Sequence, residues 1–146
     1  MCRSLARWHA LTGQQKSQLV LLAVALPVTG ALIRLFGFQK AAQACARIGG
    51  QATLRPTSAQ DLEDAQAFAR LAGIAGRRGP VTTTCLRQSL VVRAWLRRRG
   101  LDAQLKIGVR KTGGVMDAHA WVELDGVPLA QPNLDHAPFQ APDLGA

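Results

Sequence analysis

The sequence predicts one α+β domain, in which helices come first and a small antiparallel sheet follows. Apolar residues recur at helical spacing in the first half, one long helix-forming segment starts at Cys85, and apolar and polar residues alternate after residue 103. A chain of 146 residues suits a single domain with a sizeable core. We therefore expect one domain over residues 1–146, mainly helical over 1–80, with a helix and antiparallel strands over 81–146.

The first predicted helix begins near Thr12, because Gln15 three residues later completes a capping box. The apolar run at residues 19–33 follows directly, but it is shorter than the roughly 20 apolar residues of a bilayer span. It also contains Pro27, which is expected to kink or end the helix. The pattern favours a buried core helix without a secretory signal, and a membrane-associated helix is the less favoured alternative.

Two more helices are expected before residue 81. One covers residues 31–48 and closes at the Gly49-Gly50 pair. The other opens at Ser58, with Asp61 at its third position, and ends in the Arg-Arg-Gly-Pro run of residues 77–80.

The second half changes from helix to sheet. A threonine cluster caps a predicted helix over residues 85–99, which Gly100 stops. Alternating residues predict strands over 103–109 and 118–124, separated by a turn over 111–116. Asp125-Gly126 signals a hairpin into a third strand over 127–131.

The formal charge of +9 is unevenly distributed along the chain. Ten of the 18 Lys and Arg residues lie between Arg77 and Lys111, where Asp102 is the only acid. Such a bias indicates an acidic partner or, equally well, a solvated helix face. Aromatic residues are not interleaved with these cations, so nucleic acid is not the expected partner.

The three cysteines are odd in number and match no zinc spacing. They indicate a reducing compartment, hence a cytoplasmic protein, and no metal site. Cys2 and Cys45 are structural by default. Cys85 differs, because the first turn of a helix stabilises the thiolate, and its free N–H groups can hold an oxyanion.

His119 is the only histidine within a predicted strand, and it shares a face with Trp121 and Glu123. His9 and His136 lie near the two ends of the chain. A helix-borne cysteine with a strand-borne histidine is the arrangement typical of cysteine peptidases. Trp121 is expected to cover the site or pack in the core.

Four segments together resemble one family: LTGQQKSQLVLLA, CLRQSLVVRAWLRRRG, LKIGVRK and DAHAWVELDGVPL. In this order they resemble the leader peptidase of lasso-peptide biosynthesis, a stand-alone transglutaminase-like, papain-like cysteine protease. The resemblance spans nearly the whole chain. It implies a papain/transglutaminase-like fold, with Cys85 as nucleophile, His119 as general base, and hydrolysis through an acyl-enzyme without a cofactor.

The third catalytic position departs from the family, which places an Asp twelve residues after the histidine. Here that position is Gln131. A three-residue hairpin loop would pair Glu123 with Val127 and set His119 opposite Gln131, whose amide can accept the imidazole N–H. Asp135 and Asn133 are nearby alternatives, so the orienting residue stays open.

The resemblance also implies partners. The substrate is a precursor peptide with a leader, and longer family members carry their own leader-recognition domain. We therefore expect a separate leader-binding protein and, next in the sequence of reactions, the macrolactam-forming cyclase. The rival hypothesis is a non-catalytic basic module that binds nucleic acid or an anionic membrane through Arg87, Arg93 and residues 97–99.

Overall fold

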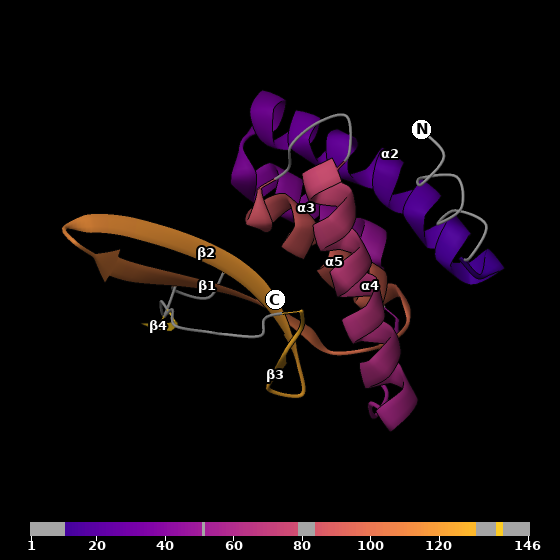
Figure 1. Cartoon of the computed structure of the whole chain (residues 1–146). Helices are drawn as coiled ribbons and strands as arrows, with labels where there is room; N and C mark the ends of the chain where they lie inside the picture. The colour runs from indigo at the N-terminus through magenta and orange to yellow at the C-terminus, as the bar shows by residue number, and fades with distance from the viewer. Residues whose placement is uncertain (1–10, 51, 79–83, 131–136, 139–146) are drawn as a thin grey trace.

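The computed structural model describes residues 11–50, 52–78, 84–130 and 137–138 (Figure 1). Within that part, four helices precede the sheet, and the hairpin of the two long strands extends to one side of the helical body. The predicted α+β architecture is confirmed. The elements are α2 (Gly13–Phe36), α3 (Phe38–Gly49), α4 (Ala59–Arg78), α5 (Cys85–Arg98), β1 (Ala103–Thr112), β2 (Val115–Leu124), β3 (Val127–Pro128) and β4 (Ala137–Pro138).

Helix α2 starts at the predicted cap and then runs further than expected. The Thr12 side chain accepts from the Gln15 N–H at 3.2 Å, and the Gln15 side chain accepts from the Thr12 N–H at 3.0 Å. The helix does not end at Pro27 but continues to Phe36, so the helix expected over residues 31–48 begins only at Phe38. Pro27 leaves the carbonyl of Ala23 without its helical donor, and Ala23 is exposed, so water can satisfy it. Gly37, with φ +81°, ends the helix instead.

The expectation of a buried core helix holds for only one face of α2. Leu22, Leu26, Thr29 and Gly30 are buried against the rest of the domain. The opposite face is exposed, and it is also apolar. By length and composition α2 could cross a membrane, and no other helix in the described ranges could.

Helices α4 and α5 form the centre of the molecule. Ser58 and Asp61 cap α4 reciprocally, since each backbone N–H donates to the other's side chain at 3.0 and 3.1 Å. Phe68 of α4 stacks on Trp95 of α5 with ring centroids 4.0 Å apart. The surrounding core joins residues of α2, α4, α5 and the sheet, including Leu22, Leu26, Leu96, Leu101, Val122 and Leu124.

The sheet is antiparallel, with the strand order β3-β2-β1-β4. The long hairpin pairs Ala103 with Leu124 at one end and Thr112 with Val115 at the other. Its turn is the pair Gly113-Gly114, whose φ values are +59° and +85°. Both strands are therefore longer than predicted, because two left-handed glycines close the hairpin without the wider loop over 111–116.

The predicted register of the next hairpin is wrong by one residue. Glu123 pairs with Pro128, and Leu124 pairs with Val127. Asp125 and Gly126 adopt φ +50° and +76°, which makes a two-residue turn rather than a three-residue loop. Asp tolerates the left-handed region, so the same Asp-Gly pair fits the shorter turn. The pairing of His119 with Gln131 loses its geometric basis, and Gln131 itself lies outside the described residues.

Candidate active site

Cys85 is the first residue of α5, as the sequence predicts. Thr84 is the N-cap, with extended backbone angles, and its hydroxyl accepts from the Arg87 N–H at 3.5 Å. The Cys85 side chain is half-buried, so it is accessible to a substrate. The first turn of α5 contains no acidic residue, so nothing in it opposes the positive end of the helix dipole.

Cys45 provides the contrasting thiol. It lies in α3 and is 7% exposed. Burial raises the pKa of Cys45, and a hydrogen bond with Thr29 offsets this only in part. A thiol that stays protonated is a poor nucleophile. Cys45 is therefore the structural cysteine that the sequence predicts, whereas Cys2 lies outside the described residues.

His119 lies on β2, and the structure describes the residues beside its imidazole ring. The imidazole stacks against Trp121, with ring centroids 6.2 Å apart and an interplanar angle of 18°. Trp121 is 2% exposed and donates its indole N–H to Glu123 at 3.0 Å. The cross-strand partner of His119 is Gly108, which brings no side chain to that face. Trp121 packs beside the histidine as expected, and Glu123 fixes the indole.

Ser89 connects the helix of Cys85 to the strand of His119. It lies one helical turn after Cys85, on the same face of α5. Its buried hydroxyl donates to the carbonyl of Ala120, the residue after His119, at 3.1 Å. The sequence analysis did not identify Ser89, although a polar residue four positions after the candidate nucleophile was a usable signal.

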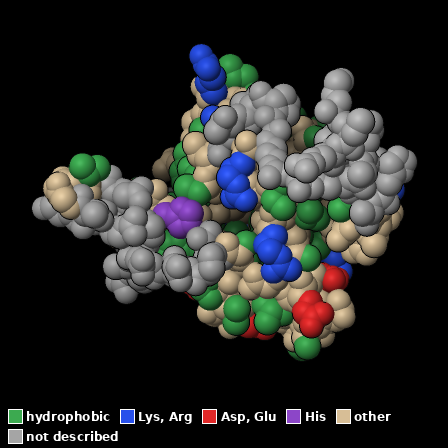
Figure 2. Space-filling view, in the orientation of Figure 1, with side chains coloured by type: hydrophobic (Ala, Val, Ile, Leu, Met, Phe, Trp, Pro, Cys, Tyr) green, Lys and Arg blue, Asp and Glu red, His purple; other side chains and the backbone are tan. Residues whose placement is uncertain are grey.

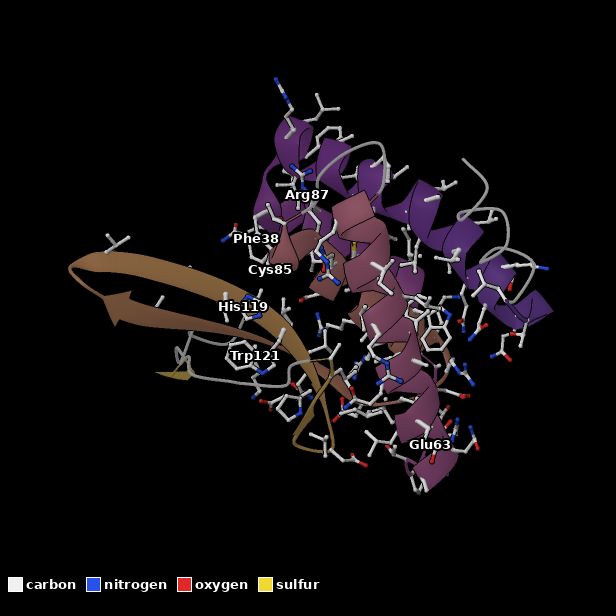
Figure 3. The ribbon with its side chains drawn as sticks, viewed as in Figure 1. Phe38, Glu63, Cys85, Arg87, His119 and Trp121 are labelled. Carbon is white, nitrogen blue, oxygen red and sulfur yellow. The ribbon has the colours of Figure 1, made fainter. Side chains whose placement is uncertain are left out.

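The position of that carbonyl places α5 at the edge of β2. The Val122 carbonyl accepts from the Leu129 N–H at 2.9 Å, on the side where β3 pairs. Alternate residues of a strand direct their carbonyls to the same edge of that strand. The Ala120 carbonyl therefore points to the same side of β2 as the Val122 carbonyl, at a position beyond the end of β3. The start of α5 therefore lies beside residues 119 and 120. In the view of Figure 3, the labels of Cys85, at the start of α5, and His119, on β2, fall close together.

All three candidates for the third catalytic group, Gln131, Asn133 and Asp135, lie outside the described residues. The chain returns to the sheet just after them. Pro138 of β4 pairs with Gly108, the residue whose other neighbour is His119. Pro138 therefore lies in the same row of the sheet as His119.

Three of the arginines in the rival basic surface are engaged within the domain. Arg93 donates to the Ala103 carbonyl at 3.4 Å, and burial lowers its pKa. Arg97 forms an ion pair with Asp102 at 2.6 Å. Arg99 contacts Asp64 at 3.4 Å and lies over the Trp95 ring. These contacts reduce the free charge that a nucleic acid or a headgroup would meet there.

Within the described ranges, no three His, Cys, Asp or Glu side chains gather closely enough to hold a metal ion. The groups that the structure describes at the candidate site are a thiol at a helix start and an imidazole on a strand. This pair suits nucleophilic attack on a carbonyl followed by proton transfer.

Comparison with known protein families identifies a related superfamily. The model of the transglutaminase-like superfamily matches residues 26–141, which include Cys85 and His119. Searches of curated proteins and of solved structures find no match. The matched segment runs from the middle of α2 past β4, so it covers most of the described helices and the whole sheet. The chain belongs to the transglutaminase-like superfamily.

Proposed function

We propose that this protein is a cysteine peptidase that removes the leader from a ribosomally made lasso-peptide precursor. The superfamily includes cysteine peptidases. The observation that carries the proposal is the Ser89–Ala120 hydrogen bond, which holds the first turn of α5 against the residue next to His119. The leader as substrate rests on the resemblance of the four sequence segments.

The reaction uses the pair as nucleophile and proton carrier. The Cys85 thiolate attacks the scissile carbonyl carbon, and backbone N–H groups at the start of α5 donate to the oxyanion that forms. His119 gives its proton to the leaving amine as the C–N bond breaks, which leaves a thioester on Cys85. Water then attacks the thioester, His119 takes a proton from that water, and the leader is released with a new carboxylate.

A third group would orient the imidazole by accepting its other N–H. Gln131, Asn133 and Asp135 are the candidates, and all three lie between β3 and β4 in the sequence. Trp121 contributes from the side by shielding the ring from water, since it is almost fully buried and its ring lies nearly parallel to the imidazole. A shielded hydrogen bond is stronger than one exposed to solvent.

The partners follow from the proposed substrate. A separate leader-binding protein would present the precursor to the site, and the macrolactam-forming cyclase would take the released core peptide. All of these proteins would meet in the cytoplasm.

The test is cleavage of the precursor by the full chain, with and without the leader-binding protein, followed by mass spectrometry of both fragments. Cys85→Ala should lower the rate by at least about a thousandfold, because the nucleophile is lost. Cys45→Ala is the matched control and should remain active. Cleavage by Cys85→Ala at the wild-type rate would refute the peptidase. Cleavage of unrelated peptides but not of the precursor would refute only the leader specificity.

A further inference from the structure

The outer face of α2 is an exposed apolar stripe. Val20, Val24 and Val28 are 57%, 61% and 50% exposed, and Leu35, further along the same face, is 73% exposed. Steps of three and four residues connect these positions along one side of a helix. Leu21 and Phe36 border the stripe and are also exposed. An apolar face of this length normally marks an interaction surface.

The opposite face fixes α2 in the domain. Leu22 is fully buried and Leu26 is 2% exposed, and both belong to the core that includes Phe68 and Leu96. Crossing a bilayer would remove these side chains from the core. A partner that covers the stripe must therefore meet α2 along its length, which is about 36 Å for 24 residues.

The part of the sequence that contains α2 carries charges of one sign. Residues 1–60 contain no Asp or Glu, although they contain seven Lys and Arg residues. Lys16 lies near the start of α2 and Arg34 in its last turn, so the two cations frame the stripe. In Figure 2 the acidic side chains gather in the lower half of the view, whereas α2 crosses the upper half. The remaining cations of this region are Arg3, Arg7, Lys40, Arg47 and Arg55.

We propose that the outer face of α2 binds the surface of an anionic lipid bilayer, with the helix lying in the plane of the interface. Apolar side chains of such a helix enter the boundary between headgroups and acyl chains by about 5–10 Å, while flanking cations contact anionic headgroups. Lys16 and Arg34 are placed for those contacts.

A second copy of this chain is the less suitable occupant. Self-association through a two-fold axis would bring the same face of two molecules together. Each copy would then present Lys16 and Arg34 to the other, with no acid in residues 1–60 to neutralise them. Anionic headgroups supply the missing negative charge.

The experiment is flotation of the full chain with vesicles of phosphatidylcholine alone and with vesicles that also contain phosphatidylglycerol. Binding is expected on the anionic vesicles and should weaken as salt is raised. Replacing Lys16 and Arg34 by Gln should weaken binding by about fivefold for each cation. The triple variant Val20→Ser, Val24→Ser, Val28→Ser should weaken it by at least about tenfold.

Val115→Ser is the matched control, because Val115 is 70% exposed but lies in the β1–β2 hairpin. It should bind as the wild type does. Circular dichroism of each variant verifies that the helices are intact. Wild-type protein that binds neither vesicle overturns the proposal. The proposal is also overturned if light scattering shows that the wild type is a dimer and that the triple variant is a monomer. That result would mean that the stripe binds a second copy of this chain. Vesicle binding needs no catalysis, so Cys85→Ala should bind normally.

Discussion

The two ends of α5 differ in how they are held. At the carboxyl end, the Arg55 side chain and backbone N–H donate to the carbonyls of Arg99 and Gly100 at 3.2 and 2.9 Å. Arg97 and Arg99 add ion pairs to Asp102 and Asp64. At the amino end, the Thr84 hydroxyl caps the helix and the Ser89 hydroxyl donates to the Ala120 carbonyl of β2.

The two ends of α5 therefore differ in what they contribute: the carboxyl end stabilises the core, and the amino end carries the candidate site. The carboxyl end joins the loop before α4, the aromatic stack and the start of β1, so it holds the core together. The amino end carries the half-buried thiol of Cys85, which must stay accessible if it acts on the proposed peptide substrate. Functional sites commonly lower the stability of a protein, and stabilising contacts elsewhere in the fold compensate for this loss.

The largest effect is expected at the aromatic stack. Phe68→Ala should lower the free energy of unfolding by about 3–5 kcal/mol, because it leaves a cavity against Trp95. Urea unfolding measures this loss. Phe36→Ala removes a ring that is 56% exposed and should change stability far less. Equal losses in the two variants would contradict the assignment of the core to the carboxyl end.

At the amino end, changing the orienting group should affect rate rather than stability. Gln131→Ala should lower kcat on the order of tenfold to hundredfold, because the Cys85–His119 pair survives but the ring is less well positioned. Steady-state kinetics with the precursor measures the change, and thermal unfolding should be unaffected. If Gln131→Ala matches the wild type and Asp135→Ala is the slow variant, the orienting residue is Asp135.

Ser89→Ala tests the link between the two regions. Its loss leaves the buried Ala120 carbonyl without a donor, which should cost about 1–3 kcal/mol of stability. Activity should fall by more than the loss of folded protein can explain, because the same hydrogen bond holds α5 beside β2. Ser17→Ala, at an exposed hydroxyl near the start of α2, is the control and should be neutral. Activity that remains unchanged after Ser89→Ala would show that the bond does not position the site.

The smallest effect is expected at Asp61 and depends on pH. Two hydrogen bonds from Arg55 at 2.7 Å, followed by those from Ser58, hold the pKa of Asp61 well below its ordinary value. A carboxyl whose pKa is lower in the folded state stabilises the fold above the unfolded pKa of about 4, and this stabilisation fades as the pH falls below it. The side chain of Arg55 is 46% exposed, so solvent weakens the pair.

Asp61→Asn should therefore unfold more easily than the wild type at neutral pH, and the difference should shrink below about pH 4. Urea titrations at a series of pH values measure both trends. Asp125→Asn, in the exposed hairpin turn, should show neither. A constant difference across the pH series would mean that the charge of Asp61 does not contribute.

Local signals predicted the elements that depend on local chemistry. The Thr12 capping box, the Ser58–Asp61 cap and the start of α5 at Cys85 were all predictable, because a cap involves residues three positions apart. The face that carries His119, Trp121 and Glu123 was equally accessible, because side chains alternate along a strand. These features position Cys85 and His119.

The errors arose where two local structures fit the same residues. Asp-Gly suits both a two-residue and a three-residue hairpin, and only the backbone of Asp125 decides between them. Pro27 breaks a helix unless the carbonyl that it leaves unpaired can reach water. The Ser89 contact depends on how α5 meets β2, which is a property of tertiary packing that no single segment contains.

Gln66 of α4 has a consequence for the end of the sheet. Its amide donates to the Pro128 carbonyl at 3.0 Å and accepts from the Ala130 N–H at 2.8 Å. A single side chain thus takes the place of a neighbouring strand where β3 ends. The middle of α4 and the backbone of residues 128–130 should consequently open together, as one cooperative unit in native-state hydrogen exchange. The amide of Ala130 should then exchange as slowly as those of the helix, although no strand pairs with it.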